Sequence, residues 1–302
     1  MRYRIGITLG DPAGIGPEIV QAALASGRLP PTAEYSIIAR PVACSLGQPT
    51  RQTAHAALAA LEEITSLALR GEIQAVVTAP IHKARMYEIG FRFPGQTEFF
   101  ADRCNVKNFA MLLTGGKLTV ALVTTHLPLH AVPSALNQGE IVRVGLLLRD
   151  FLHRRLIPRP QIAVAGLNPH AGESGTLGRE EIEIITPAIA ELNSRSQTTH
   201  HQSPIFAGPF SPDTLFHQAA KGAWDGVLCM YHDQGLIPLK LHAFHEGVNV
   251  TLGLPFPRTS PDHGTAFEIA GKGIACADSM IAAINLAVEL VQRTSGIADR
   301  MG

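Results

Sequence analysis

Short apolar segments alternate with longer segments of helical periodicity along most of this 302-residue chain. Such alternation predicts a mostly parallel sheet with helices on both faces, because each crossover between parallel strands needs a connection of helical length. The predicted strands are residues 4–9, 35–39, 75–78, 109–113, 118–124, 162–165 and 226–230. The predicted helices are residues 15–25, 52–69, 139–154 and 278–292. Gly115 and Gly116 favour an antiparallel hairpin between the fourth and fifth strands.

Two segments interrupt this alternation. Residues 193–209 are polar and predict a surface loop or a domain junction, whereas residues 241–261 are rich in Gly and Pro and predict irregular structure. The length of the chain is compatible with two α/β domains. We expect residues 1–125 plus 262–302 to form the first α/β/α domain and residues 126–261 to form the second.

The composition excludes several classes of function. Lys and Arg together number 25, as do Asp and Glu, so nothing indicates the basic face that a nucleic-acid or membrane-surface binder needs. The four cysteines form no CxxC pair and predict buried thiols in a reducing compartment. No long apolar region opens the sequence, and no stretch approaches the roughly 20 apolar residues that span a bilayer. We therefore expect a cytoplasmic protein with no nucleic-acid or membrane partner.

Three histidines follow different predicted strands. They are His126 in VALVTTHLPLH, His170 in IAVAGLNPHAGESG and His232 in GVLCMYHDQG. Ligands bind at the carboxyl ends of the strands in open α/β sheets, and imidazole is a common ligand of divalent metals. The pattern predicts a metal site with positions left open for a substrate. Asp233 is placed to orient a ligating imidazole or to accept a proton, and His263 in SPDHG is an alternative site residue.

Other polar groups suit an anionic ligand. The turn GDPAGIGPE at residues 10–18 lacks the third glycine of the G-x-G-x-x-G fingerprint, so a standard dinucleotide fold is not supported. Lys83 in TAPIHK is a candidate for binding a phosphate or carboxylate. Thr97 in FPGQTEFF either binds a polar ligand or caps the helix that follows. Three further candidates, suited to phosphate or carboxylate recognition, are Lys240, Asn249 and Arg258.

Read together, these segments closely resemble the 4-hydroxythreonine-4-phosphate dehydrogenase family of pyridoxal phosphate biosynthesis. The resemblance runs from residue 5 to about residue 273, in the order of the family. It is carried by ITLGDPAGIGPEI, TAPIHK, FPGQTEFF, TTHLPL, LNPHAGESGTLGREEI, GPFSPDTLF, MYHDQGLIPLK and GVNVTLGLPFPRTSPDHGTAFEIAG. It implies two α/β/α domains with a cleft between them, as in the isocitrate and isopropylmalate dehydrogenases. It also implies a homodimer with its active site at the subunit interface.

The resemblance also assigns roles to residues. It implies that the metal ligands, drawn from both chains, are His126, His170 and His232. It implies that the substrate is bound by Thr97, Lys240, Asn249 and Arg258, with Gln96 beside them. The candidate catalytic residues are Asp233 and Lys83. The implied cofactors are NAD or NADP and a divalent metal, which is zinc, cobalt or magnesium; no residue is assigned to the nicotinamide cofactor. Gln96 departs from the family pattern GHTEF, and Gln neither titrates near neutral pH nor carries charge.

The implied reaction is oxidation of the C3 hydroxyl of 4-phosphooxy-L-threonine, followed by decarboxylation to 3-amino-2-oxopropyl phosphate in pyridoxine 5′-phosphate biosynthesis. Gln96 leaves alternative substrates open. These are 4-phospho-D-threonate, 4-phospho-D-erythronate and a cis-dihydrodiol dicarboxylate. Alternatives of another class are a non-catalytic metal- or anion-binding protein and a metal-dependent aldolase. The three histidines argue against the non-catalytic protein, and an aldolase would need no nicotinamide.

Overall fold

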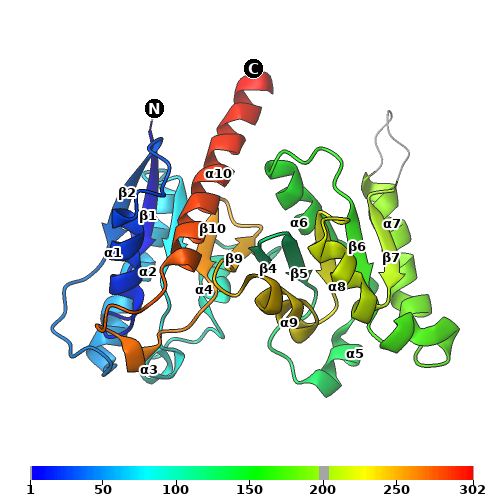
Figure 1. Cartoon of the computed structure of the whole chain (residues 1–302), viewed down its shortest axis with the longest axis horizontal. Helices are drawn as coiled ribbons and strands as arrows, with labels where there is room; N and C mark the ends of the chain where they lie inside the picture. Colours follow the sequence, from blue (N-terminus) through cyan, green and yellow to red (C-terminus); the bar gives the residue numbers. More distant parts are fainter. Residues whose placement is uncertain (1, 197–203, 302) are drawn as a thin grey trace. The chain divides into compact units, whose positions relative to one another are not determined.

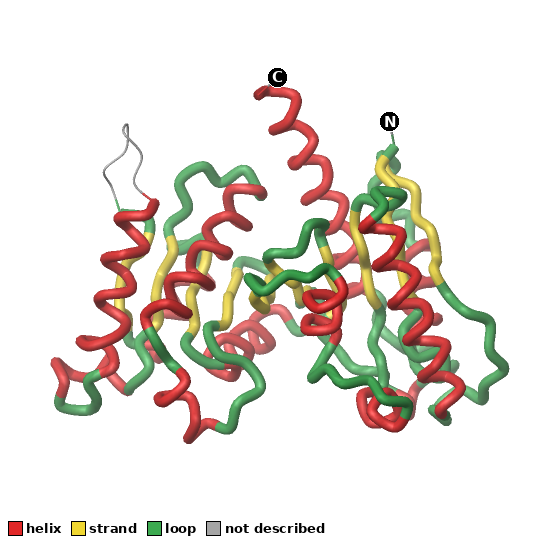
Figure 2. The backbone as a smooth tube through the Cα atoms, turned by 180° about the vertical axis from the view of Figure 1, so that it is seen from behind, coloured by secondary structure: helices red, strands yellow, loops and turns green. Residues whose placement is uncertain are grey.

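The computed structural model describes residues 2–196 and 204–301. It divides the chain into two compact units. The first unit is Met1–Lys107 with His245–Gly302, and the second unit is Asn108–Phe244. Each unit contains a sheet with helices on both faces, as Figures 1 and 2 show. The predicted α/β fold is therefore confirmed.

The sheet of the first unit is mostly parallel. Its strands lie in the order β2 (Ala33–Ile38), β1 (Tyr3–Thr8), β3 (Ala75–Thr78), β10 (Arg258–Pro261) and β9 (Val248–Leu252), and only β9 runs antiparallel to its neighbour β10. The helices on one face are α2 (Arg51–Leu69), α3 (Lys83–Glu88) and α4 (Gln96–Arg103). Those on the other face are α1 (Gly16–Ala25) and α10 (Asp278–Met301). The carboxyl ends of β1 and β3 lie side by side, because Thr8 pairs with Thr78.

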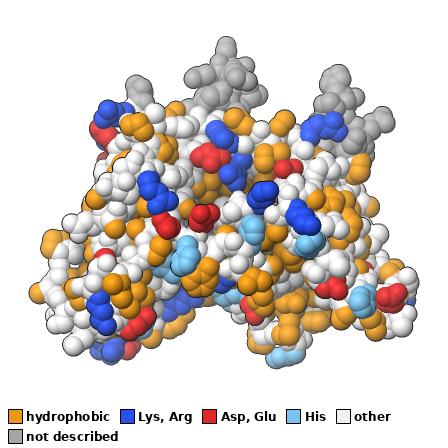
Figure 3. Space-filling model, viewed as in Figure 1, with side chains coloured by type: hydrophobic (Ala, Val, Ile, Leu, Met, Phe, Trp, Pro, Cys, Tyr) orange, Lys and Arg blue, Asp and Glu red, His pale blue; other side chains and the backbone are white. Residues whose placement is uncertain are grey.

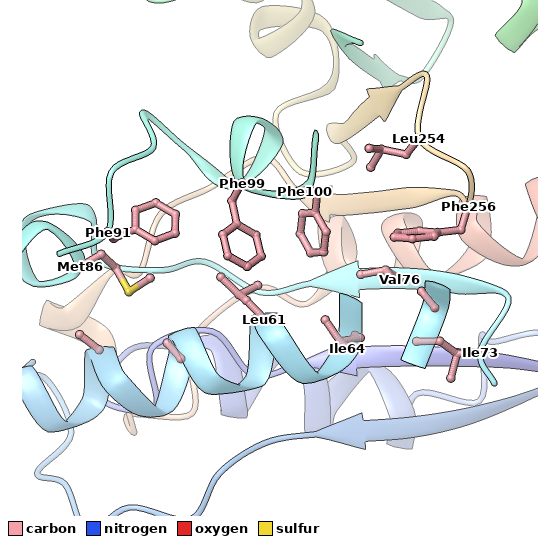
Figure 4. Close-up of a cluster of buried hydrophobic side chains, with 13 residues drawn as sticks. Leu61, Ile64, Ile73, Val76, Met86, Phe91, Phe99, Phe100, Leu254 and Phe256 are labelled. Atoms are coloured by element: carbon pink, nitrogen blue, oxygen red, sulfur yellow. The ribbon is translucent and has the colours of Figure 1, made fainter. Parts of the chain in front are cut away.

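The long helix α2 illustrates why the sequence folds as it does. Thr50 caps its first turn: its hydroxyl accepts from Thr53 N at 3.2 Å, and Thr53 Oγ1 accepts from Thr50 N at 3.0 Å. The apolar residues of α2 recur at helical spacing and face the sheet. There Leu61 and Ile64 meet Phe99 and Phe100 of α4 in the core shown in Figure 4. This core fixes the start of α4 over the sheet.

The sheet of the second unit begins with the predicted hairpin, which is confirmed. Its strands lie in the order β4 (Ala110–Gly115), β5 (Leu118–Leu122), β8 (Gly226–Cys229), β6 (Ile162–Ala165) and β7 (Phe206–Phe210). β4 and β5 are antiparallel, and the remaining pairs are parallel. The helices on one face are α6 (Gln138–Arg154) and α7 (Thr186–Ser196), and those on the other are α8 (Pro212–Ala220) and α9 (His232–Ala243). A short helix, α5 (Val132–Ala135), follows the loop after β5.

The structure corrects the prediction for the two segments that were expected to be irregular. Residues 241–261 contain the end of α9 and both strands β9 and β10. VNVTL alternates as a strand does, and Gly253, Pro255 and Pro257 fall in the turn between the two strands. Residues 193–209 contain the end of α7 and most of β7. Residues 197–203 of that segment lie outside the described residues.

Two surface properties bear on possible partners. None of the described helices is both long and apolar enough to cross a membrane. On the face shown in Figure 3, Lys and Arg side chains lie among Asp and Glu side chains instead of gathering in one basic patch.

Candidate active site

Two of the three predicted metal ligands lie in one pocket of the second unit. Thr124 N and Thr124 Oγ1 both donate to Met230 O, at 3.2 and 2.7 Å, so the chain segments after β5 and β8 leave the sheet together. The ring centroids of His126 and His232 lie 5.6 Å apart in consequence. Both line a pocket of about 410 Å³ whose wall also includes Thr125, Leu127, Tyr231, Asp233 and Ile237.

Neighbouring side chains fix the start of α9. His232 Nδ1 lies 2.6 Å from Asp233 Oδ1, which orients the ring and leaves Nε2 to face a ligand. The buried amide of Gln234 accepts from Met230 N and donates to Gly166 O, both at 2.7 Å. Gln234 thus ties the end of β8 to the end of β6. The structure therefore supports an orienting role for Asp233, while its role as a base stays a prediction.

His170 lies on a separate loop of the same unit. It belongs to the turn Pro169–Gly175 after β6, and its side chain is exposed. Its φ of 51° and the φ of 50° at His126 are both left-handed, which is unfavourable for residues with a Cβ atom. The pKa of the Asp213 carboxyl is held below its ordinary value, first by a hydrogen bond from Ser211 and then by the charge of His170, so His170 lies close to α8.

The three histidines of one chain do not form a complete site. Over residues 2–196 and 204–301, no three His, Cys, Asp or Glu side chains are grouped so that they could hold one metal ion. The His126–His232 pair nevertheless has the chemistry of part of a site, because two imidazoles share a pocket and one is oriented by a carboxylate.

Arg258 is the central residue of a second cluster, in the first unit. It begins β10, where it pairs with Val76 of β3, and it is only 2% exposed. The guanidinium donates to Thr78 Oγ1 at 2.6 Å, to Gln96 Oε1 at 3.1 Å and to Thr251 Oγ1 at 3.2 Å. It also lies 5.4 Å from the centre of the Phe100 ring.

The charge of Arg258 is not neutralised by a paired carboxylate. Burial lowers the pKa of Arg258 to about 9, and the charge of Glu98 partly opposes this shift. Among the described residues, no acceptor reaches Arg258 Nε, and all three hydrogen-bond partners above are neutral oxygens. A desolvated cation with a spare donor suits an anionic ligand such as a phosphate.

The first turn of α4 adjoins Arg258. Gln96 Nε2 donates to Ala79 O at 3.1 Å, which turns Gln96 Oε1 towards the guanidinium. Gly95 is the N-cap of α4, so the alternative reading of Thr97 as the cap is wrong. Thr97 Oγ1 instead lies 3.3 Å from Thr251 Oγ1. The free N–H groups of a helix start and the nearby guanidinium favour negative charge at the same place.

Two other predicted residues belong to this unit. Asn249 lies on β9 on the same face as Thr251, and no described residue donates to its buried Oδ1. The Lys83 Nζ lies 4.0 Å from the point where a Cβ of Gly95 would be, which places the amine near the start of α4. Both residues are therefore available to a ligand at this cluster.

Two further predicted residues are Lys240 and His263. Lys240 is half-buried on α9 in the second unit. His263 lies after β10 in the first unit, with its Nδ1 3.1 Å from Gly264 O. Their roles stay predictions.

Sequence reasoning missed several residues of the first unit. Thr78 and Thr251 hold the guanidinium of Arg258, and their position at or near the ends of buried strands was the available signal. Asp11 is only 1% exposed in the glycine-rich turn after β1, where Oδ1 accepts from Ala13 N at 3.0 Å. Within the described residues Asp11 Oδ2 has no hydrogen-bond partner.

Comparison with known proteins decides the family. A family model described as pyridoxal phosphate biosynthetic protein PdxA matches residues 18–287. The chain belongs to the PdxA family. A relative from Desulforapulum autotrophicum named 4-hydroxythreonine-4-phosphate dehydrogenase is 43% identical, over 94% of this chain and 94% of the relative. A relative from Pectobacterium atrosepticum named D-threonate 4-phosphate dehydrogenase is 39% identical, over 95% of this chain and 98% of the relative.

Solved structures agree with membership of the PdxA family. The crystal structure of 4-hydroxythreonine-4-phosphate dehydrogenase from Klebsiella pneumoniae is 38% identical with a TM-score of 0.80, covering 96% of this chain and all of that one. Isocitrate dehydrogenase from Methylococcus capsulatus shares the fold, with a TM-score of 0.57, 16% identity and coverage of 98% of this chain and 87% of that one. The expected family, its fold and its class of enzyme, a dehydrogenase, are confirmed.

Proposed function

We propose that this PdxA-family enzyme oxidises the C3 hydroxyl of 4-phosphooxy-L-threonine with NAD or NADP. The resulting β-keto acid loses CO₂ to give 3-amino-2-oxopropyl phosphate for pyridoxine 5′-phosphate biosynthesis. Relatives named 4-hydroxythreonine-4-phosphate dehydrogenase support this substrate. The observation that carries the proposal is the buried, unneutralised guanidinium of Arg258 beside the first turn of α4.

Phosphate recognition is assigned to the first unit. Arg258 supplies a fixed cation, and its Nε is available as a donor. The N–H groups at the start of α4 and the Thr97 hydroxyl supply further donors. Lys83 and Asn249 complete the polar surroundings, and Lys240 is proposed to bind the substrate from α9. Burial of Arg258 makes its contact with a phosphate stronger than it would be in water.

The metal is assigned to the histidines. His126 and His232 fit two ligand positions, and we propose His170 as the third, supplied within a homodimer that draws ligands from both chains. Zinc, cobalt and magnesium are the candidate ions, and such an ion supplies Lewis acidity that lowers the pKa of a bound hydroxyl. Asp233 orients His232 and is also the proposed proton acceptor. The homodimer itself and its interfacial active site rest on the family resemblance.

A second substrate class is favoured by Gln96. The family usually has His at this position, and Gln96 here forms neutral hydrogen bonds to Ala79 O and Arg258. The phosphate site therefore lacks a titratable group that the usual sequence supplies. Relatives named D-threonate 4-phosphate dehydrogenase are 39% identical to this chain. Oxidation of 4-phospho-D-threonate or 4-phospho-D-erythronate is thus the second candidate function.

A panel assay tests the proposal. The purified enzyme is given 4-phosphooxy-L-threonine, 4-phospho-D-threonate or 4-phospho-D-erythronate with NAD or NADP, and formation of reduced nicotinamide is followed. We expect the highest kcat/KM with 4-phosphooxy-L-threonine, loss of activity with a chelator, and recovery on addition of a divalent metal. Higher activity with a phosphorylated sugar acid would favour the second candidate function. Activity that survives the chelator, or a His126→Ala variant with full rate, would contradict the metal assignment.

A further inference from the structure

The loop that carries His170 has an unfavourable backbone. His170, Ala171, Glu173 and Ser174 have φ values of 51°, 51°, 43° and 56°, and Gly172 between them has 81°. A left-handed conformation is unfavourable for each residue that has a Cβ atom, because the Cβ then lies too close to the following carbonyl oxygen. Four such residues in one turn persist only if the surrounding structure holds them.

Glu181 is the residue that holds this loop. It is 3% exposed and begins the π-helical turn Glu181–Ile185 before α7. Its Oε1 accepts from Leu167 N at 2.7 Å and from Asn168 N at 2.8 Å, and its Oε2 accepts from Asn168 Nδ2 at 3.0 Å. Hydrogen bonds to a charged group are stronger than those between neutral groups, so these three bonds help to offset the cost of the left-handed turn.

The backbone before and after His170 also packs directly against the Glu181 carboxylate. A Cβ atom on Gly166 would lie 3.0 Å from Glu181 Oε1, and one on Gly172 would lie 2.6 Å from Glu181 Oε2. Both positions therefore require glycine for the loop to close around the carboxylate. The loop before and after His170 is fixed to one buried group, while the His170 side chain stays exposed.

We propose that Glu181 is a positioning residue, which sets the backbone of the His170 loop so that the imidazole meets the metal. This inference rests on the proposed function, because it takes His170 as a ligand. Glu181 acts through the backbone of Leu167 and Asn168. Asp233 acts differently, because it contacts the imidazole of His232 directly.

The test measures metal binding directly, apart from activity. Full-length enzyme freed of metal is titrated with Co²⁺, and the visible absorption of the bound ion is recorded. We expect Glu181→Gln, which keeps the size of the side chain, to weaken Co²⁺ binding by roughly 10–100-fold, the range found when partners of metal ligands are changed. Glu183→Gln is the matched control, because Glu183 is exposed two residues further on and pairs only with Arg179, at 2.5 Å. It should bind Co²⁺ as the unchanged chain does.

A double-mutant cycle separates positioning from general destabilisation. If Glu181 acts through His170, Glu181→Gln should weaken Co²⁺ binding no further in a His170→Ala background. Should Glu181→Gln fail to fold, Asn168→Ala decides. It removes the Asn168 Nδ2 donor, which Glu181 Oε2 shares with Glu180 Oε2, and keeps both backbone hydrogen bonds to Glu181. We expect a smaller weakening from it, in the same direction.

The outcomes are distinguishable. Three results would overturn the inference without overturning the proposed metal chemistry. They are wild-type Co²⁺ affinity in the folded Glu181→Gln variant, equal weakening by Glu183→Gln, and additive effects in the cycle. If Glu181→Gln does not fold, unchanged binding by Asn168→Ala overturns it. An unchanged chain that binds no Co²⁺ would overturn the proposed metal chemistry together with the inference.

Discussion

At the scale of single residues, Arg258 combines a cost to folding with the phosphate-binding role that we propose for it. A charged group transferred from water to the protein interior is destabilising unless it is paired, and the partners of Arg258 are neutral oxygens. The pKa of about 9, lowered by burial, keeps the side chain charged at neutral pH. A guanidinium stays protonated in proteins even when burial lowers its pKa, so Arg258 keeps its charge for an anionic ligand.

Replacement of Arg258 by Met tests both effects. We expect Arg258→Met to lower kcat/KM for the phosphorylated substrate by roughly 100-fold or more, because hydrogen bonds to a charged group contribute about 1.5–3 kcal/mol each. The melting temperature should stay the same or rise, since the buried charge is removed and the volume is kept. Arg70→Met, at an exposed pair with Glu72, is the control and should change neither quantity. A variant with normal kcat/KM would exclude Arg258 from the phosphate site.

At the scale of elements, the packing of α9 on the sheet positions His232. Gly235 faces β5, and a Cβ there would lie 2.9 Å from Leu122 Cδ2 and 3.1 Å from Cys229 Sγ. This close packing fixes the position of α9 on the sheet. It thereby also fixes the first residues of α9, which line the His126–His232 pocket. Glycine is therefore required here for close approach, although it is a poor helix former.

The direction in which substitution of Gly235 changes stability can be predicted. Ala is favoured over Gly within a helix by about 1 kcal/mol, but overpacking in a core costs roughly 1–3 kcal/mol. We expect Gly235→Ala to lower the melting temperature and to weaken Co²⁺ binding by displacing the start of α9. Gly139→Ala in α6, where only Asn137 Oδ1 lies near at 3.4 Å, should leave both properties intact or raise stability. Equal stability of the two variants would show that α9 has room to move.

The elements differ in how well the sequence predicts them. Buried strands such as β6 and β8 are continuous apolar runs, so their positions were predicted closely. The short helices α3 and α8 were not predicted, because six to nine residues give too few turns for a clear period. α4 was expected only as the helix that Thr97 would cap, without an end. Strand-end histidines could be found from the pattern. The oxygens that hold Arg258 could not, because they come from segments far apart in sequence and only the fold brings them together.

At the scale of the whole molecule, the predicted site residues divide between the two units. His126, His170, His232, Asp233 and Lys240 belong to Asn108–Phe244. The other unit holds Lys83 and four of the proposed substrate-binding residues, Gln96, Thr97, Asn249 and Arg258. No three candidate ligands group together in the described part of one chain. We propose a dimer in which His170 of one subunit completes the His126–His232 pair of the other, which would account for the absence of a three-ligand group within one chain.

Complementation between inactive variants tests that arrangement. His170→Ala and His232→Ala should each be inactive alone. If the ligands come from two subunits, a mixed dimer holds one site with both defects and one intact site. Dissociation and random reassociation of equal amounts should then restore roughly a quarter of the activity of the unchanged enzyme, since half of the dimers are mixed and each has one working site. Activity that stays absent, in mixtures shown to contain the mixed dimer, would mean that one chain supplies all three ligands.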